Sequence, residues 1–206
     1  MANPLALLCF LILSVLQGST PQYKSPTLRD KVRQEGHVRS VGVADDFIPS
    51  LDKLVSGSDL ILRGRVVDES TRLSSDEYAV YTDYTIEILD VYKDDQSLVR
   101  VGDRIVVTRY GGNIVVEGKP ISLETINVPP IRWVVPHVFF IRKPKGFGAD
   151  AQYYFAGDNL GPFVLERGKI VCEAKKELRH SVAAPFCDKS ELQFLQTLRE
   201  KIEGQQ

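Results

Sequence analysis

The stretch YAVYTDYTIEILDVYK, residues 78–93, carries the strongest structural signal in the chain. Its apolar and polar residues alternate up to Ile88, a period of two that is typical of a β-strand. After Ile88 the alternation shifts by one residue, because Leu89 and Val91 become the apolar positions. Such a shift predicts a β-bulge, and a bulge bends a long strand as the strands of a small barrel require. The alternative is a strand that simply ends at Ile88.

The segments on either side also have strand composition. SDLILRGRVV (58–67) comes before this stretch, and VGDRIVVTRYGGNIVVEG (101–118) and FVLERGKIV (163–171) come after it. Gly64 lies inside the first of these strands, where a missing side chain permits a bend or a close backbone approach.

We expect further strands at 104–110, 114–117, 134–142 and 153–156, with a hairpin turn at Gly111-Gly112-Asn113. Residues 68–77 are predicted as a polar connection and 121–130 as irregular, because Pro129-Pro130 cannot occupy a central strand. The predicted fold is mostly β: a small antiparallel β-barrel of the OB or netrin-like type with a C-terminal α-helix.

Two helices are expected beside these strands. Ile48, Leu51, Leu54 and Val55 recur at helical spacing before Gly57, which predicts a short helix leading into the first strand. A C-terminal helix is predicted at about 188–203. It would begin with Asp188 and Glu191 in a capping-box-like arrangement, and its apolar face would hold the following residues: Leu192, Leu195, Leu198 and Ile202, with Phe194 beside them.

The N-terminal region divides into two parts. Residues 1–19 are predicted to be a signal peptide, because Leu5–Leu16 is apolar and small residues follow it. A short buried helix or an uncleaved anchor is the alternative. Residues 20–46 are predicted to be a flexible polar linker, with a partner-binding arm as the alternative. The β-barrel domain would then span residues 47–206. Cleavage would leave an exported protein, periplasmic or secreted, with no stable membrane anchor.

Removal of the signal peptide would leave Cys172 and Cys187 as the two cysteines. An even number of cysteines in an exported protein favours a disulfide between them. Closing a loop of this length stabilises a fold by about 3 kcal/mol in the chain-entropy model. A pair of free thiols is the alternative.

Composition and motifs restrict the possible functions. The formal net charge of -1 argues against a general nucleic-acid binder. The sequence has no nucleophile elbow, phosphate-binding loop or zinc-protease motif, and no cofactor or metal is expected. His137 lies beside an apolar strand and is predicted to be a satisfied, partly buried residue rather than a base.

Aromatic residues give the one hint of a binding site. Tyr110, Trp133 and Tyr153, the last followed by Tyr154, could line a ligand groove, because aromatic rings combine a large stacking area with a polar edge. The alternative is that these rings form core and cross-strand pairs.

The chain resembles a group of uncharacterised exported bacterial β-barrel proteins. The resemblance rests on the motifs SDLI-x-x-G-x-V from Ser58, YTDYT from Tyr81 and VGD-x-I from Val101, within residues 48–171. More distantly, the pattern is similar to tissue-inhibitor-of-metalloproteinase (netrin-like) modules, which insert an N-terminal cysteine into a protease zinc site; this chain has no cysteine there. RWVVPHVFF (132–140) also departs from the pattern, and no functional residue is carried over from either family.

These inferences lead to a ranked set of functions. The first is a non-enzymatic binding or interaction module of the bacterial envelope or the extracellular space, with a protein or a glycan as its partner. It requires an exposed aromatic groove near Tyr110 and Trp133. A protease-inhibitor-like module is the alternative and requires a protruding, rigid edge. An enzyme comes third and requires a pocket where ionisable groups with shifted pKa values converge.

Overall fold

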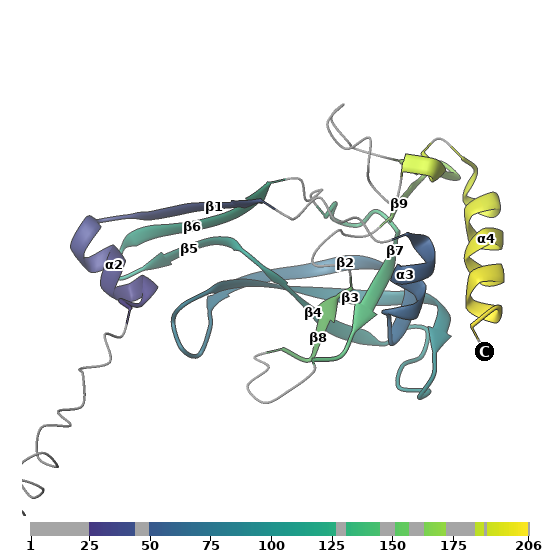
Figure 1. Cartoon of the computed structure of the whole chain (residues 1–206), viewed down its shortest axis with the longest axis horizontal. Helices are drawn as coiled ribbons and strands as arrows, with labels where there is room; N and C mark the ends of the chain where they lie inside the picture. Colours follow the sequence, from purple (N-terminus) through teal and green to yellow (C-terminus); the bar gives the residue numbers. More distant parts are fainter. Residues whose placement is uncertain are drawn as a thin grey trace, which may run out of the picture.

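The computed structural model describes residues 25–43, 50–126, 131–144, 151–156, 163–171, 184–187 and 189–205. The described residues form a mostly β protein with a C-terminal helix, so the predicted class is confirmed at this level. The elements, labelled in Figure 1, follow in chain order: α2 (Leu28–Glu35), β1 (Val38–Val43), α3 (Leu51–Ser56), β2 (Leu60–Leu73), β3 (Val80–Asp94), β4 (Arg104–Tyr110), β5 (Gly112–Val116), β6 (Lys119–Ile126), β7 (His137–Arg142), β8 (Tyr153–Phe155), β9 (Phe163–Glu166), β10 (Lys169–Val171), η2 (Ala184–Phe186) and α4 (Glu191–Glu203).

The described strands form a large and a small sheet. The large sheet has the order β10-β9-β7-β2-β3-β4-β8, and β7 pairs with β8 in addition. Its pairings are antiparallel except β4–β8, which is parallel. The small sheet has the order β1-β6-β5 and lies with α2 at the opposite end of the molecule from α4 (Figure 1).

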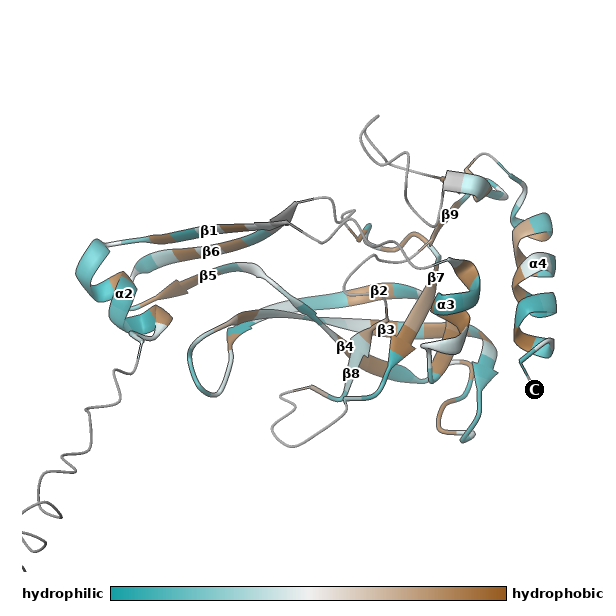
Figure 2. Ribbon diagram, viewed as in Figure 1, coloured by the Kyte–Doolittle hydropathy of each residue, from teal (hydrophilic) through white to brown (hydrophobic). Residues whose placement is uncertain are grey.

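The central strands of the large sheet are buried on both faces. Ile61 and Phe140 contact one apolar cluster, which also contains α3, α4 and η2. Leu62 and Phe139, the next residues along each strand, contact a second cluster on the opposite face. This two-sided burial explains why β7 is apolar without alternation (Figure 2).

The shift of phase after Ile88 is a bulge, as predicted. Arg63 lies opposite Asp90 and Gly64 lies opposite Ile88, so Leu89 has no residue opposite it on β2. Ile88 and Val91 then contact the same apolar cluster although they are three residues apart. The strand continues to Asp94 instead of ending at Ile88.

Strand β2 is longer than predicted. Residues 68–73, expected in a polar connection, continue the strand and pair with the first half of β3. They are mostly polar because this half of the β2–β3 hairpin extends beyond the two large apolar clusters. A cross-strand polar pair stabilises it instead, because Arg72 Nε donates a hydrogen bond to Asp83 Oδ2 at 2.6 Å.

The prediction of a flexible linker over 20–46 is wrong for its described part, residues 25–43. Helix α2 is stabilised by a capping box at Thr27 and Asp30, and Gly36 ends it in a left-handed conformation. The backbone N–H of Leu28 donates to the carbonyl of Glu77, and Val32 is fully buried against the small sheet. Contacts with distant residues order this polar segment, so composition alone could not reveal it.

The predicted hairpin at Gly111-Gly112 is also wrong. Strands β4 and β5 do not pair; β4 belongs to the large sheet, whereas β5 pairs with β6 in the small one. Both glycines have positive φ (97° and 138°), and a Cβ on Gly112 would lie 2.4 Å from Thr82 Oγ1. The pair therefore lets the chain cross closely over the β2–β3 hairpin as it passes from one sheet to the other.

Residues 121–126, predicted to be irregular, belong to strand β6, which pairs with both β1 and β5. The prolines on which that prediction rested, at 129 and 130, lie outside the described residues. The observed hairpin of the small sheet turns at Glu117 and Gly118, whose φ angles of 52° and 76° are those of a tight type I′ turn. In the large sheet, β9 and β10 form a hairpin that turns at Arg167 and Gly168, both with positive φ.

Both predicted helices are present. In α3, Leu51, Leu54 and Val55 are buried, and Gly57 is the C-cap. The N-cap of α4 is Ser190, two residues after the proposed Asp188, and it forms a capping box with Gln193.

The buried face of α4 also differs in part from the prediction. Phe194, Leu198 and Ile202 are buried, whereas Leu192 is 76% exposed. Arg63 of β2 forms an ion pair with Glu191 at the first turn of the helix, at 3.2 Å.

We expect Gly64→Ala to destabilise the protein by about 1–3 kcal/mol, because the added methyl overpacks a bulged strand. A Cβ at Gly64 would lie 2.6 Å from Ile86 Cγ2 and 2.9 Å from the carbonyl oxygen of Glu87. Gly42→Ala is the matched control, since the nearest atom to its Cβ would be 3.9 Å away. Urea denaturation measures both variants; equal midpoints would contradict the tight contact.

Candidate functional site

A groove of about 470 Å³ opens where the β2–β3–β4 sheet meets the small sheet. This volume is within the range of small-molecule sites. Gly111 and Gly112 form part of its wall, so the crossing between the sheets creates the groove. Its lining residues are Glu69, Thr71, Thr82, Tyr84, Arg109, Tyr110, Gly111, Gly112, Asn113, Leu123 and Glu124.

The floor and the rim of the groove differ in character. Thr82, Tyr84 and Leu123 are buried, and the Thr82 hydroxyl donates a hydrogen bond to the carbonyl of Gly111 at 2.7 Å. Tyr110 at the rim is 47% exposed. A floor of fixed, partly apolar groups beside an exposed tyrosine can hold an amphiphilic ligand.

Arg109 and Tyr84 form a desolvated pair in this wall. Burial lowers the pKa of Arg109, which nevertheless stays charged, and its hydrogen bond with Tyr84 opposes that decrease. Burial likewise raises the pKa of the Tyr84 hydroxyl. Glu69 supplies a nearby negative charge, and Glu124 at the other side forms an ion pair with Arg39 at 3.6 Å. The groove is therefore polar but close to electrically balanced.

Trp133 is connected to the groove without lining it. Its indole Nε1–H donates a hydrogen bond to Glu69 Oε2 at 3.2 Å, and 48% of the residue is exposed. A bridge with Val66 holds its backbone against β2. Tyr110 and Trp133, two of the three aromatic residues singled out from the sequence, are thus exposed: Tyr110 lines the groove, and Trp133 contacts Glu69 of its wall.

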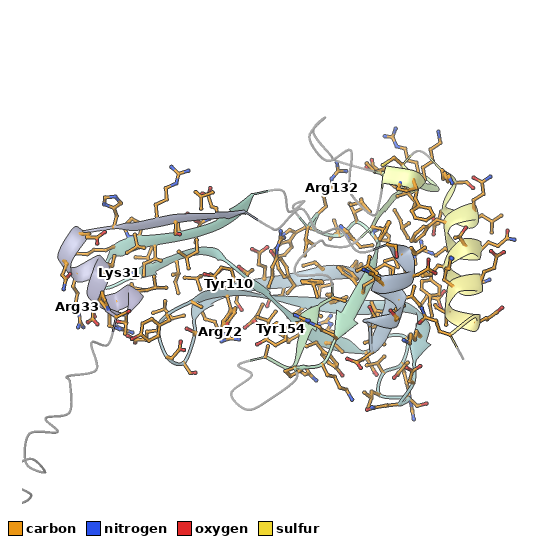
Figure 3. The ribbon with its side chains drawn as sticks, viewed as in Figure 1. Lys31, Arg33, Arg72, Tyr110, Arg132 and Tyr154 are labelled. Carbon is orange, nitrogen blue, oxygen red and sulfur yellow. The ribbon has the colours of Figure 1, made fainter. Side chains whose placement is uncertain are left out.

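The third aromatic residue, Tyr153, does not belong to this surface. It is 6% exposed and contacts the same apolar cluster as Tyr84, so the prediction of a ligand contact there is wrong. Successive residues of a strand point to opposite faces, so Tyr154 lies on the other side of β8. Figure 3 shows Tyr154 in the same region of the molecule as Tyr110 and Arg72.

Sequence reasoning missed Glu69 and Arg109. Glu69 fell inside the predicted polar connection, so its place on a strand was not apparent. Arg109 lies on the face opposite Thr108 and Tyr110, and only the pairing of β4 with β3 shows that this face points into a groove. The alternation of threonines and charged residues along 69–73 and 108–110 was the available signal.

Of the predicted disulfide, Cys172 lies outside the described residues, whereas Cys187 follows η2 directly. The pairing therefore stays a prediction. Among the described residues, no group of three or more His, Cys, Asp and Glu side chains is placed to hold a metal ion. None of the described helices has the length and hydropathy needed to cross a membrane.

Three described groups have strongly shifted pKa values, and they lie on separate elements. Hydrogen bonds from Arg33 and Arg29 lower the pKa of Glu117, in the β5–β6 turn, to about 2. Burial raises the pKa of Tyr92 on β3 to about 12. Burial also lowers the pKa of His137 on β7 to about 4. These three groups do not converge on the groove.

His137 is fully buried rather than partly buried as predicted. Its Nδ1 lies 2.6 Å from the carbonyl oxygen of Val135, whereas its Nε2 is buried with no hydrogen-bond partner. Its ring stacks on Phe139 at 5.3 Å. These contacts suit a neutral imidazole that donates from Nδ1.

Comparisons with known proteins leave the family open. No protein-family model matches the chain, and no curated protein matches it significantly.

We expect the protein to lose stability as the pH falls from about 6.5 to about 4, by about 3 kcal/mol at most from His137. The pKa of folded His137 is about 4, against an ordinary 6.5, so the unfolded chain takes up this proton first. The stabilisation is therefore fully present above pH about 6.5 and is lost toward pH 4. His137→Gln removes this part of the pH dependence, while His37→Gln, at an exposed position, keeps it. Urea denaturation across this range measures the difference; identical slopes for both variants would exclude His137 as the cause.

Proposed function

We propose that this protein is an exported, non-enzymatic binding module of the bacterial envelope or extracellular space, and that its groove binds a neutral oligosaccharide. The observation that carries this proposal is the groove of about 470 Å³, bounded by an exposed tyrosine and connected through Glu69 to an exposed tryptophan. Aromatic faces stack on the apolar faces of sugar rings, and fixed polar groups accept or donate to hydroxyls.

The scaffold proposed for this site is a closed OB-type barrel. The pairings support it, because they lead from β2 through β3, β4, β8 and β7 back to β2, with only β4–β8 parallel. The bulge at Leu89 and the close contact at Gly64 supply the bending that a small barrel needs. Barrels of this type bind oligonucleotides and oligosaccharides at one strand face and the adjoining loops.

Charge balance favours the oligosaccharide over an oligonucleotide. A nucleic-acid site concentrates cations to neutralise phosphates. Here Arg109 has Glu69 nearby, and Arg39 is paired with Glu124. The formal net charge of -1 agrees with this balance.

A specific observation also favours the second candidate, a protease-inhibitor-like module. Val134 is 68% exposed and has a φ of 56°, a strained conformation for a β-branched residue. Its N–H donates to the carbonyl of Val66, and Arg132 is paired with Glu166 at 2.7 Å. The segment is therefore rigid, exposed and apolar, as an inhibitory edge requires. We rank it below the groove.

We expect the purified protein to bind neutral glycans on a microarray that displays neutral and anionic structures. Tyr110→Ala weakens this binding about tenfold or more, because it removes the exposed ring at the rim. Trp133→Phe keeps a ring but removes the hydrogen bond to Glu69, and its effect is smaller. Leu192→Ala, on the exposed side of α4, is the matched control and binds as the unaltered protein does. The absence of glycan binding, or tighter binding to single-stranded oligothymidine, would refute the proposal.

Export has a separate test. We expect the full-length chain, expressed in a bacterium, to lose its first 18 or 19 residues, which intact mass measures directly. We also expect Cys172 and Cys187 of the mature protein to resist alkylation until a reductant is added. If both thiols react without reductant, the disulfide is absent; if residues 1–19 remain attached, the signal-peptide prediction is wrong.

A further inference from the structure

The rim of the groove continues onto a second aromatic surface on the outer face of the sheet. The rings of Tyr110 and Tyr81 lie edge to face with 6.2 Å between their centroids. The guanidinium of Arg72 lies 5.4 Å from the centre of the Tyr81 ring. These residues form one row across β2, β3 and β4, since Arg72 is opposite Tyr81 and Tyr81 is opposite Tyr110.

Tyr154 extends this surface onto β8. It is the partner of Thr108 in the parallel β4–β8 pairing, and Thr108 lies two residues before Tyr110 on the same face of β4. Figure 3 shows Tyr110, Arg72 and Tyr154 grouped near the middle of the molecule, away from Lys31 and Arg33 at its left end. We call the surface formed by Tyr81, Tyr110 and Tyr154 the tyrosine face.

The polar groups under the tyrosine face are fixed and neutralised. Asp83 accepts hydrogen bonds from Arg72 Nε and from the Thr108 hydroxyl, each at 2.6 Å. The Arg72 charge is therefore balanced within the surface, as the charge of Arg109 is in the groove. Such a face offers aromatic stacking with little net charge, which suits an uncharged polyhydroxylated chain better than a phosphate backbone.

Tyr110 belongs to both surfaces. It lines the groove together with Arg109, and its ring also contacts Tyr81 on the opposite face of the sheet. Strand β4 ends at Tyr110, and the chain then turns away through Gly111 and Gly112. Beyond Tyr110, strand β4 therefore no longer separates the groove from the tyrosine face.

We propose that the ligand is an extended oligosaccharide whose one end occupies the groove while the rest crosses Tyr110 and lies along the tyrosine face. This inference rests on the proposed function and adds the class of substrate: a chain rather than a monosaccharide or disaccharide. It assigns Tyr81 and Tyr154 to outer subsites and Glu69 and Arg109 to the inner one.

The test measures affinity against chain length. The probes are cello-oligosaccharides and chito-oligosaccharides of two to eight units, titrated while the fluorescence of Trp133, the one tryptophan of the chain, reports occupancy of the groove. We expect affinity to rise about tenfold or more between the short and long members of the series that binds. Tyr154→Ala abolishes this increase and leaves the affinity for the short members unchanged.

A second variant tests whether the effect of Tyr154→Ala comes from loss of structure instead of loss of the stacking ring. Tyr154→Phe keeps the stacking ring and retains at least half of the increase, and thermal unfolding compares both variants with the unaltered protein. An affinity that does not depend on length, or a Tyr154→Ala variant with normal length dependence, overturns this inference while leaving the groove as the binding site. If neither the cello-oligosaccharides nor the chito-oligosaccharides bind at any length, the proposed function and this inference are both refuted.

Discussion

The structure depends on one antiparallel ladder, the pairing of β2 with β3 from Leu60 opposite Asp94 to Leu73 opposite Val80. Its first half lies between the two large apolar clusters, and its second half extends beyond them. The neighbouring described elements attach to one or the other of these halves. β7 and β4 extend the sheet on either side, whereas α2 and the small sheet pack around Leu73 and Val80.

One half of the ladder can lie in the core while the other extends beyond it, because the register of the ladder is irregular. Register shifts occur near Leu62, Gly64 and Val67, and each adds twist and curvature. An unbroken ladder of this length would be flatter and could not bring β8 beside both β4 and β7. The bulges are thus the local cause of the curvature on which the proposed barrel depends.

The candidate site exists where the chain leaves this ladder. At Gly112 the chain crosses so close to Thr82 that a Cβ would lie 2.4 Å from Thr82 Oγ1, and the groove lies beside this crossing. The outer half of the ladder supplies Glu69 and Tyr84 to the groove and Arg72 and Tyr81 to the opposite face. A binding surface on both faces of one hairpin follows from the alternation of side chains along its strands.

The amino-acid sequence by itself determined the features that follow from local periodicity and turn chemistry. These are the β-rich class, the bulge after Ile88, the close contact at Gly64 and the two helices beside the sheet. Only the tertiary structure decided which strands pair, because a Gly-Gly turn permits a hairpin and a crossing equally. It also decided that residues 25–43 are ordered, since α2 is stabilised by Glu77 and Glu117, far away in the sequence. The alternation of side chains along a strand places Tyr153 and Tyr154 on opposite faces of β8. Which of the two is buried depends on the side of β8 that faces the apolar core, and that is a property of the assembled fold.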